Sequence, residues 1–266
     1  MTGEVHARER GRRVAVLLEY DGTAYSGSQY QDNGPSIQNE LETAIEKLTG
    51  AFARVAFAGR TDAGVHALGQ VAAVDTGSRL ERAEFVRGLN HFLPPDIAVR
   101  ALEEVDPAFD PRRDARSRKY RYRIDTREVR SALERHRAWH IGRALDVPAM
   151  KAAARSLLGE HDFAAYAAPF EGKTRRTLRR CDVCESGGFV TVEMQAQSFL
   201  PHQVRRTVGP LVEVGLGRIS ADALVTWLEE AVPSSAGPAA PACGLYLMHI
   251  EYVGLEFGLD ERERTD

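Results

Sequence analysis

A polar loop between two apolar segments is the feature that most limits how this chain can fold. Residues 55–58 and 71–74 are short and apolar, and we predict that both form buried strands. The segment between them contains two glycines, an arginine, an aspartate and a histidine. Glycine permits positive φ and lets another molecule approach the backbone closely. The pattern therefore predicts a tight loop that presents a carboxylate and a guanidinium between two strands.

Asp62 is the candidate catalytic acid of this loop. Arg60 stands two residues before it, and a neighbouring cation favours the ionised form of a carboxyl group. From these residues alone a second interpretation stays open, in which the arginine and the aspartate belong to an ordinary polar surface turn.

The remaining pattern indicates an α+β protein. We predict two helix-on-sheet domains with mainly antiparallel sheets that meet at a central catalytic cleft, because clefts at domain junctions commonly bind substrates. The predicted organisation is a flexible N-terminal arm at 1–13, an N-terminal domain with the aspartate loop at 14–107, a C-terminal domain at 108–254, and an acidic tail at 255–266. Periodicity and capping residues predict helices at 37–49, 82–92, 146–158, 202–214 and 220–230, and strands at 14–19, 97–102, 119–124, 190–196 and 245–252.

The charge of the chain is unevenly distributed. A formal net charge of −3 taken alone argues against a nucleic-acid partner, which usually needs a basic surface. Residues 112–123 and 173–180 are nevertheless dense in arginine and lysine. Because salt confines the reach of each charge to roughly 8–10 Å, a local patch can bind RNA on an acidic protein.

Other classes of site receive little support. Three cysteines are too few for a disulfide framework and are typical of a reducing cytosol, and we interpret the pair Cys181 and Cys184 as structural. His136 and His140 have helical metal-ligand spacing but no carboxylate at a useful distance. We therefore expect no metal site. The absence of a long apolar run predicts a cytoplasmic protein with no membrane partner.

The string Gly-Arg-Thr-Asp-Ala-Gly-Val-His, residues 59–66, closely resembles the signature of the TruA family of tRNA pseudouridine synthases. Further segments resemble that family in the same order, and together they span residues 14–253. These segments are YDGT at 20–23, LPPDIAV at 93–99, FDPR at 109–112, ARSRKYRY at 115–122, LGEHDF at 158–163 and GLYL at 244–247.

The resemblance implies roles for particular residues. Asp62 would be the catalytic aspartate, and Arg60 would orient its loop and fill the gap left by a flipped base. Tyr120 would contact the uracil, and Arg205 would pair with the aspartate. Without the resemblance, Tyr120 is an ordinary strand aromatic and Arg205 an ordinary helix arginine.

The resemblance also implies a substrate and an assembly. These are the anticodon stem-loop of tRNA, with modification at positions 38, 39 and 40, and a homodimer. No cofactor is expected. The residues expected to contact RNA, each of which has a solvated surface as its alternative, are Arg112, Arg116, Arg118, Arg121, Arg175, Arg176 and His202.

The residues are compatible with more than one reaction route and more than one function. The aspartate can capture ribose C1′ covalently or remove a ribose proton, and the sequence does not choose between these routes. Ser28, Gln203 and Arg206 depart from the family pattern, which usually has an aromatic residue, methionine and asparagine there. The alternative functions are a catalytically silent RNA-binding module or tRNA-folding chaperone, and a nucleoside hydrolase. The first predicts no effect of losing Asp62, and the second has no evident use for two arginine-rich runs.

Overall fold

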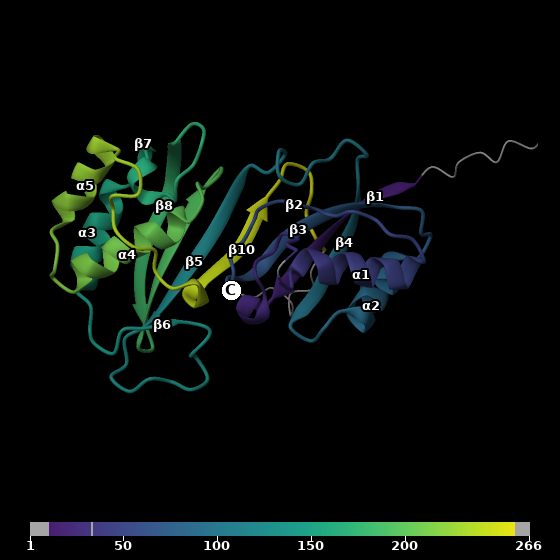
Figure 1. Cartoon of the computed structure of the whole chain (residues 1–266), viewed down its shortest axis with the longest axis horizontal. Helices are drawn as coiled ribbons and strands as arrows, with labels where there is room; N and C mark the ends of the chain where they lie inside the picture. The colour runs from purple at the N-terminus through teal and green to yellow at the C-terminus, as the bar shows by residue number, and fades with distance from the viewer. Residues whose placement is uncertain (1–10, 33, 259–266) are drawn as a thin grey trace, which may run out of the picture.

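The computed structural model describes residues 11–32 and 34–258. This part of the chain forms ten strands and five α-helices, whose arrangement is drawn in Figure 1. The strands are β1 (Arg12–Tyr20), β2 (Ala56–Phe57), β3 (His66–Thr76), β4 (Ile97–Val105), β5 (Ser117–Asp125), β6 (Trp139–His140), β7 (Gly159–Asp162), β8 (Arg175–Ser186), β9 (Phe189–Ala196) and β10 (Leu245–Glu251). The helices are α1 (Ile37–Thr49), α2 (Arg82–Phe92), α3 (Val147–Ser156), α4 (Gln203–Gly215) and α5 (Ala221–Glu230), with short 3-10 turns at Gly22–Ala24, Ala164–Tyr166 and Ala242–Gly244.

All ten strands belong to one sheet. Its order is β4-β1-β3-β10-β5-β9-β8-β7, with β2 paired to β3 and β6 paired to β5. Most neighbours are antiparallel, whereas β10 runs parallel to β3 and pairs with it at two positions, Tyr246 with His66 and Leu247 with Ala67. On its other side β10 pairs antiparallel with β5 over a longer register. The last strand of the chain therefore joins strands from its first half to strands from its second half.

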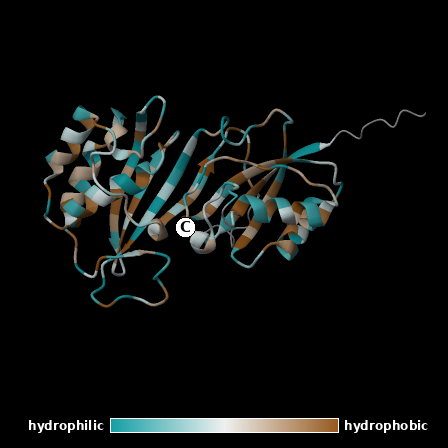
Figure 2. Ribbon diagram, viewed as in Figure 1, coloured by the Kyte–Doolittle hydropathy of each residue, from teal (hydrophilic) through white to brown (hydrophobic). Residues whose placement is uncertain are grey.

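The helices form two groups at opposite ends of the sheet (Figure 1). α1 contacts α2, which packs on β4, while α3 contacts β8, α4 and α5. Each helix carries both hydrophobic and hydrophilic residues (Figure 2), and the hydrophobic ones face the core. In α1, for example, Ile37, Leu41 and Ile45 are all at most 1% exposed. The strands β3, β10 and β5 lie between the two helix groups.

The α+β prediction is confirmed, with local corrections. The predicted buried strand at 55–58 is wrong in part, because β2 is only two residues long and Ala56 is exposed. β3 starts at His66 because its first residues already pair with β1 and β10. Residues 1–10 of the predicted arm and 259–266 of the predicted tail lie outside the described residues. Arg12 and Arg13 belong to β1, since they pair with Thr76 and Asp75.

The two predicted sheets are joined into one, and the predicted domain boundary near residue 107 stays a prediction. Within the described residues, no helix combines the length and apolar character needed to cross a membrane. The cytoplasmic location stays a prediction as well.

Candidate active site

The loop that carries Asp62 is held in place by the segment after β1. The backbone N–H of Ser28 donates to the carbonyl of Thr61 at 3.0 Å, and the Ser28 hydroxyl accepts from the N–H of Thr61 at 2.9 Å. Gly27 bridges to Asp62, and a Cβ at Gly27 would lie 2.8 Å from the Thr61 carbonyl oxygen. The hydroxyl of Tyr20 contacts that of Thr61 at 2.8 Å. The residue before Asp62 is thus fixed through both its backbone and its side chain.

Asp62 contacts two cationic or titratable side chains from the start of α4. Arg205 Nη1 donates to Asp62 Oδ2 at 3.0 Å, and His202 Nε2 lies 3.6 Å from the same oxygen. The Arg205 guanidinium is oriented by a second bond, from Nε to the carbonyl of Ala240 at 2.7 Å. Because the Asp62 side chain is 33% exposed, one side of the carboxylate stays accessible to a ligand while the other is paired. Such a carboxylate can act as a nucleophile or a base with its position already set.

Tyr120, a residue of β5, lines the same cavity as Asp62. Its side chain is 8% exposed and packs edge-to-face on Phe199, with ring centroids 5.2 Å apart. Burial raises the pKa of the Tyr120 hydroxyl well above its ordinary value, so the phenol keeps its proton at neutral pH. A Cβ at Gly59 would lie 3.9 Å from that hydroxyl, which shows how closely the Asp62 loop approaches Tyr120.

These residues surround one cavity of about 670 Å³, a volume within the range of small-molecule sites. Residues from both halves of the chain form its walls. Predicted site residues in the wall are Arg60, Asp62, Arg112, Arg118, Tyr120, Arg176, His202 and Arg205. Predicted RNA contacts that do not belong to the wall are Arg116, Arg121 and Arg175.

The arginines of the 112–123 run differ in their burial and in their partners. Arg121 alternates with Tyr120 and Tyr122 along β5 and pairs with Glu193 at 2.7 Å. Arg118 is 7% exposed, and its guanidinium donates to the carbonyls of Ala58, Arg112 and Gln197. Arg118 therefore connects three separate chain segments at the cavity wall, and desolvation lowers its pKa. Arg175 pairs with Glu160 at 3.0 Å, and both side chains are exposed.

His66, at the start of β3, is a buried histidine whose contacts the sequence did not predict. It is 3% exposed and stacks on Tyr246 with ring centroids 4.7 Å apart. Its Nδ1 accepts from the N–H of Gly22 at 3.1 Å, which assigns the ring proton to Nε2, and Nε2 contacts the carbonyl of His136 at 2.8 Å. The only available signal was its place within the resembling string at 59–66, which does not show what the ring contacts.

Burial lowers the pKa of His66 below 6.5, despite the opposing effect of Asp21. The unfolded chain therefore takes up this proton at a higher pH than the folded chain does. We expect the contribution of neutral His66 to be complete above pH 6.5 and to decline as pH falls toward the folded-state pKa, with a slope of at most about 1.4 kcal/mol per pH unit. Urea unfolding across this range should show a shallower decline for His66→Gln. A decline as steep as in the original protein would contradict this assignment. Some slope remains in the variant because burial also lowers the pKa of His249.

Ser28 gives a second prediction. Ser28→Ala leaves the buried N–H of Thr61 without its hydroxyl partner, so we expect the rate of the chemical step to fall about tenfold or more as Asp62 loses its alignment. The measurement is product formation in a single turnover at saturating substrate. Ser26→Ala is the matched control, since that hydroxyl forms no hydrogen bond with Thr61. Equal rates for both variants would show that the Ser28 hydroxyl does not position the loop.

The fold and the site together place a partly exposed carboxylate in a cavity whose wall is rich in arginine. A family model described as tRNA pseudouridine synthase matches residues 16–112 and 153–253. The chain therefore belongs to the tRNA pseudouridine synthase family, and its activity is that of an isomerase acting on tRNA.

Curated relatives resemble the chain over most of its length. A tRNA pseudouridine synthase A from Myxococcus xanthus is 47% identical over 247 residues, which cover 90% of this chain and 92% of the relative. The protein of the same name from Pelobacter propionicus is 43% identical over 244 residues, covering 91% of this chain and 100% of the relative. Among solved structures, a chain in the archaeal box H/ACA sRNP Nop10-Cbf5 complex aligns with a TM-score of 0.34 and 11% identity, covering 89% of this chain and 59% of that chain.

Proposed function

We propose that this chain converts uridine to pseudouridine in the anticodon stem-loop of tRNA, at positions 38, 39 and 40, with Asp62 as the catalytic carboxylate. The observation that carries the proposal is the 3.0 Å pair between Asp62 and Arg205 within an arginine-rich cavity, in a member of this family. Arg205 holds one oxygen of Asp62 and leaves the carboxylate partly exposed to the cavity.

The reaction breaks the bond between ribose C1′ and N1, turns the uracil, and joins C1′ to C5; C5 loses its proton and N1 gains one, so substrate and product are isomers. Asp62 either captures C1′ or removes a ribose proton, and both routes need an ionised, accessible carboxylate. Tyr120 contacts the uracil as a neutral phenol, since burial raises its pKa, and it therefore acts as a hydrogen-bond donor. No step requires a metal or an organic cofactor.

The substrate must leave the RNA stack to reach Asp62. Arg60 is exposed at the cavity wall and fills the space that the flipped uridine vacates. His202, Arg112 and Arg176 lie in the same wall and contact the RNA around the target. Arg116, Arg121 and Arg175 lie outside the wall, where they can meet more distant phosphates. A second copy of the chain forms a homodimer that grips the rest of the tRNA.

The test is the release of tritium from tRNA transcripts labelled at C5 of uridine, followed by mapping of the modified positions. Release at positions 38, 39 and 40 supports the proposal. A folded protein that binds tRNA without release would instead favour the RNA chaperone, and cleavage of free uridine would favour the nucleoside hydrolase. Release elsewhere in the tRNA would retain the chemistry and correct the target.

A further inference from the structure

We propose that residues 108–114, here named the anchor loop, form a preorganised phosphate site that presents Arg112 to an RNA backbone phosphate next to the flipped uridine. The inference rests on the proposed function for the identity of the RNA. It adds which arginine of the basic run binds the phosphate, and which residues position it.

The anchor loop is fixed from within by two aspartates. Asp110 Oδ1 accepts from the N–H groups of Arg112 at 2.9 Å and Arg113 at 2.8 Å, and Asp114 Oδ2 accepts from the N–H of Asp110 at 2.8 Å. The N–H of Asp114 donates back to the carbonyl of Asp110 at 3.0 Å. Aspartates that bond nearby backbone in this manner stabilise tight turns.

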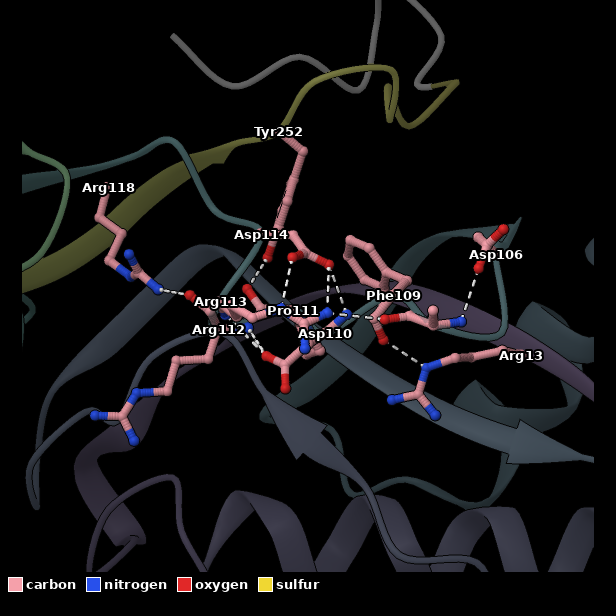
Figure 3. A network of polar contacts seen from close by, with 11 residues as sticks. Arg13, Asp106, Phe109, Asp110, Pro111, Arg112, Arg113, Asp114, Arg118 and Tyr252 are labelled. Carbon is pink, nitrogen blue, oxygen red and sulfur yellow. Dashed lines mark hydrogen bonds and ion pairs between the residues drawn. The ribbon is translucent and has the colours of Figure 1, made fainter.

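Three side chains from other parts of the fold hold the carbonyls of the same loop (Figure 3). Arg13 of β1 donates to Phe109 at 2.7 Å, Tyr252 donates to Pro111 at 2.6 Å, and Arg118 of β5 donates to Arg112 at 2.9 Å. Tyr252 directly follows β10, so the loop is tied to β1, β5 and the end of β10 at once. Its backbone is therefore set before any ligand binds.

Arg112 differs from its neighbour in what its side chain does. Its guanidinium is exposed, belongs to the wall of the cavity that contains Asp62, and forms no hydrogen bond or ion pair within residues 11–32 and 34–258 (Figure 3). Arg113 also belongs to this wall, but its guanidinium is engaged within the loop, by Asp114 at 3.0 Å and the carbonyl of Ala108 at 2.9 Å. The guanidinium of Arg113 is therefore engaged by the loop, whereas that of Arg112 is available to a ligand.

A second observation favours an anion at this place. Arg118 contributes a buried positive charge behind Arg112, and across the described part of the chain it pairs with carbonyls and with no carboxylate. The two carboxylates of the anchor loop are engaged elsewhere, Asp114 by the guanidinium of Arg113 and Asp110 by backbone N–H groups, and within the described residues neither forms an ion pair with Arg112 or Arg118. A phosphodiester supplies one negative charge and acceptor oxygens that match the planar fork of arginine. Because the same cavity contains Asp62, the phosphate belongs to the target nucleotide or its neighbour.

The test compares Arg112→Gln with Arg218→Gln in equilibrium binding of unmodified tRNA transcript across a salt series. We expect Arg112→Gln to weaken binding by about tenfold to a hundredfold, and to lower the slope of log K against log salt by about one. Arg218→Gln is the matched control: the exposed Arg218 pairs with Glu213 at 3.0 Å and lies outside the cavity wall, so its loss should change affinity less than about threefold. Equal losses for the two variants, or an unchanged salt slope in Arg112→Gln, would overturn the proposal.

Tyr252→Phe tests the positioning of the loop without a change of charge. We expect a raised half-saturating tRNA concentration with an unchanged single-turnover rate at saturation, and no further loss when Tyr252→Phe is added to Arg112→Gln. Additive losses would show that Tyr252 does not act through Arg112.

Inorganic phosphate should compete weakly with tRNA for binding to the original protein, and should compete less for binding to Arg112→Gln. Since binding is measured apart from tritium release, a protein that binds through Arg112 but makes no pseudouridine would refute the proposed function alone.

Discussion

Asp62→Asn should abolish tritium release from C5-labelled tRNA while leaving tRNA binding largely intact. The amide keeps the size of the carboxylate but carries no negative charge and is a poor nucleophile and base. Removal of a nucleophile or its base from an organised site commonly costs at least about 10⁴-fold in rate, because the remaining groups do not replace it. Arg205 then lacks the anion that it contacts at 3.0 Å, and its bond to the carbonyl of Ala240 remains.

The control for this experiment is Asp75→Asn. Asp75 also pairs with an arginine, Arg13 at 2.8 Å, but its side chain is 74% exposed and lies outside the cavity wall. It should keep a rate close to that of the original protein. If Asp62→Asn released tritium within about tenfold of this control, the carboxylate would not be the catalytic group.

Arg118→Met should produce the largest loss of stability among the arginines of the 112–123 run. The substitution keeps an apolar stem of similar length but removes the donors to the carbonyls of Ala58, Arg112 and Gln197. An unsatisfied buried polar group costs about 1–3 kcal/mol, so we expect the free energy of unfolding to fall by about 3 kcal/mol or more. The gain from no longer burying a charge offsets part of this loss.

Urea unfolding of Arg118→Met beside Arg116→Met measures the effect. Arg116 is exposed and outside the cavity wall, so its substitution should change the free energy by no more than about 0.5 kcal/mol. Matching midpoints and slopes for the two variants would show that the bonds of Arg118 contribute nothing net. We also expect weaker tRNA binding by Arg118→Met, since the anchor loop loses one of its supports.

Local signals in the sequence predicted the helices well. α1 and α2 have the predicted bounds, because Ser36 caps the first and Gly50 ends it with positive φ, and Pro94 follows the second. The predicted strands at 119–124 and 190–196 are confirmed as the centres of β5 and β9, since period-two alternation predicts a half-buried strand. These features depend on residues close together in the chain.

The geometry of the site depends on contacts that local patterns do not encode. Asp62 and Arg205 are separated by 143 positions, and only the resemblance suggested their pairing, which the structure contains at 3.0 Å. The joining of two predicted sheets by β10 is likewise non-local. The sequence predicted part of the arrangement of the 112–123 run, because alternation along 119–124 puts Arg121 on the opposite face of the strand from Tyr120. The same alternation puts Arg118 on the face of Tyr120, but the sequence carried no signal for its partners, which are carbonyls of three separate segments.

The central place of β10 also affects when the protein gains its function during synthesis. Ribosomes release a chain from its N-terminus onward, and early segments begin to fold while later ones are still being made. β3 and β5 therefore cannot be joined into one sheet until β10 is made, since β10 is the last strand of the described chain. Until residues 245–251 emerge, the edges of both halves are unpaired and open to wrong partners. A nascent chain should consequently remain unable to modify RNA until residues 245–251 have left the ribosome, and chaperone binding should peak just before that point.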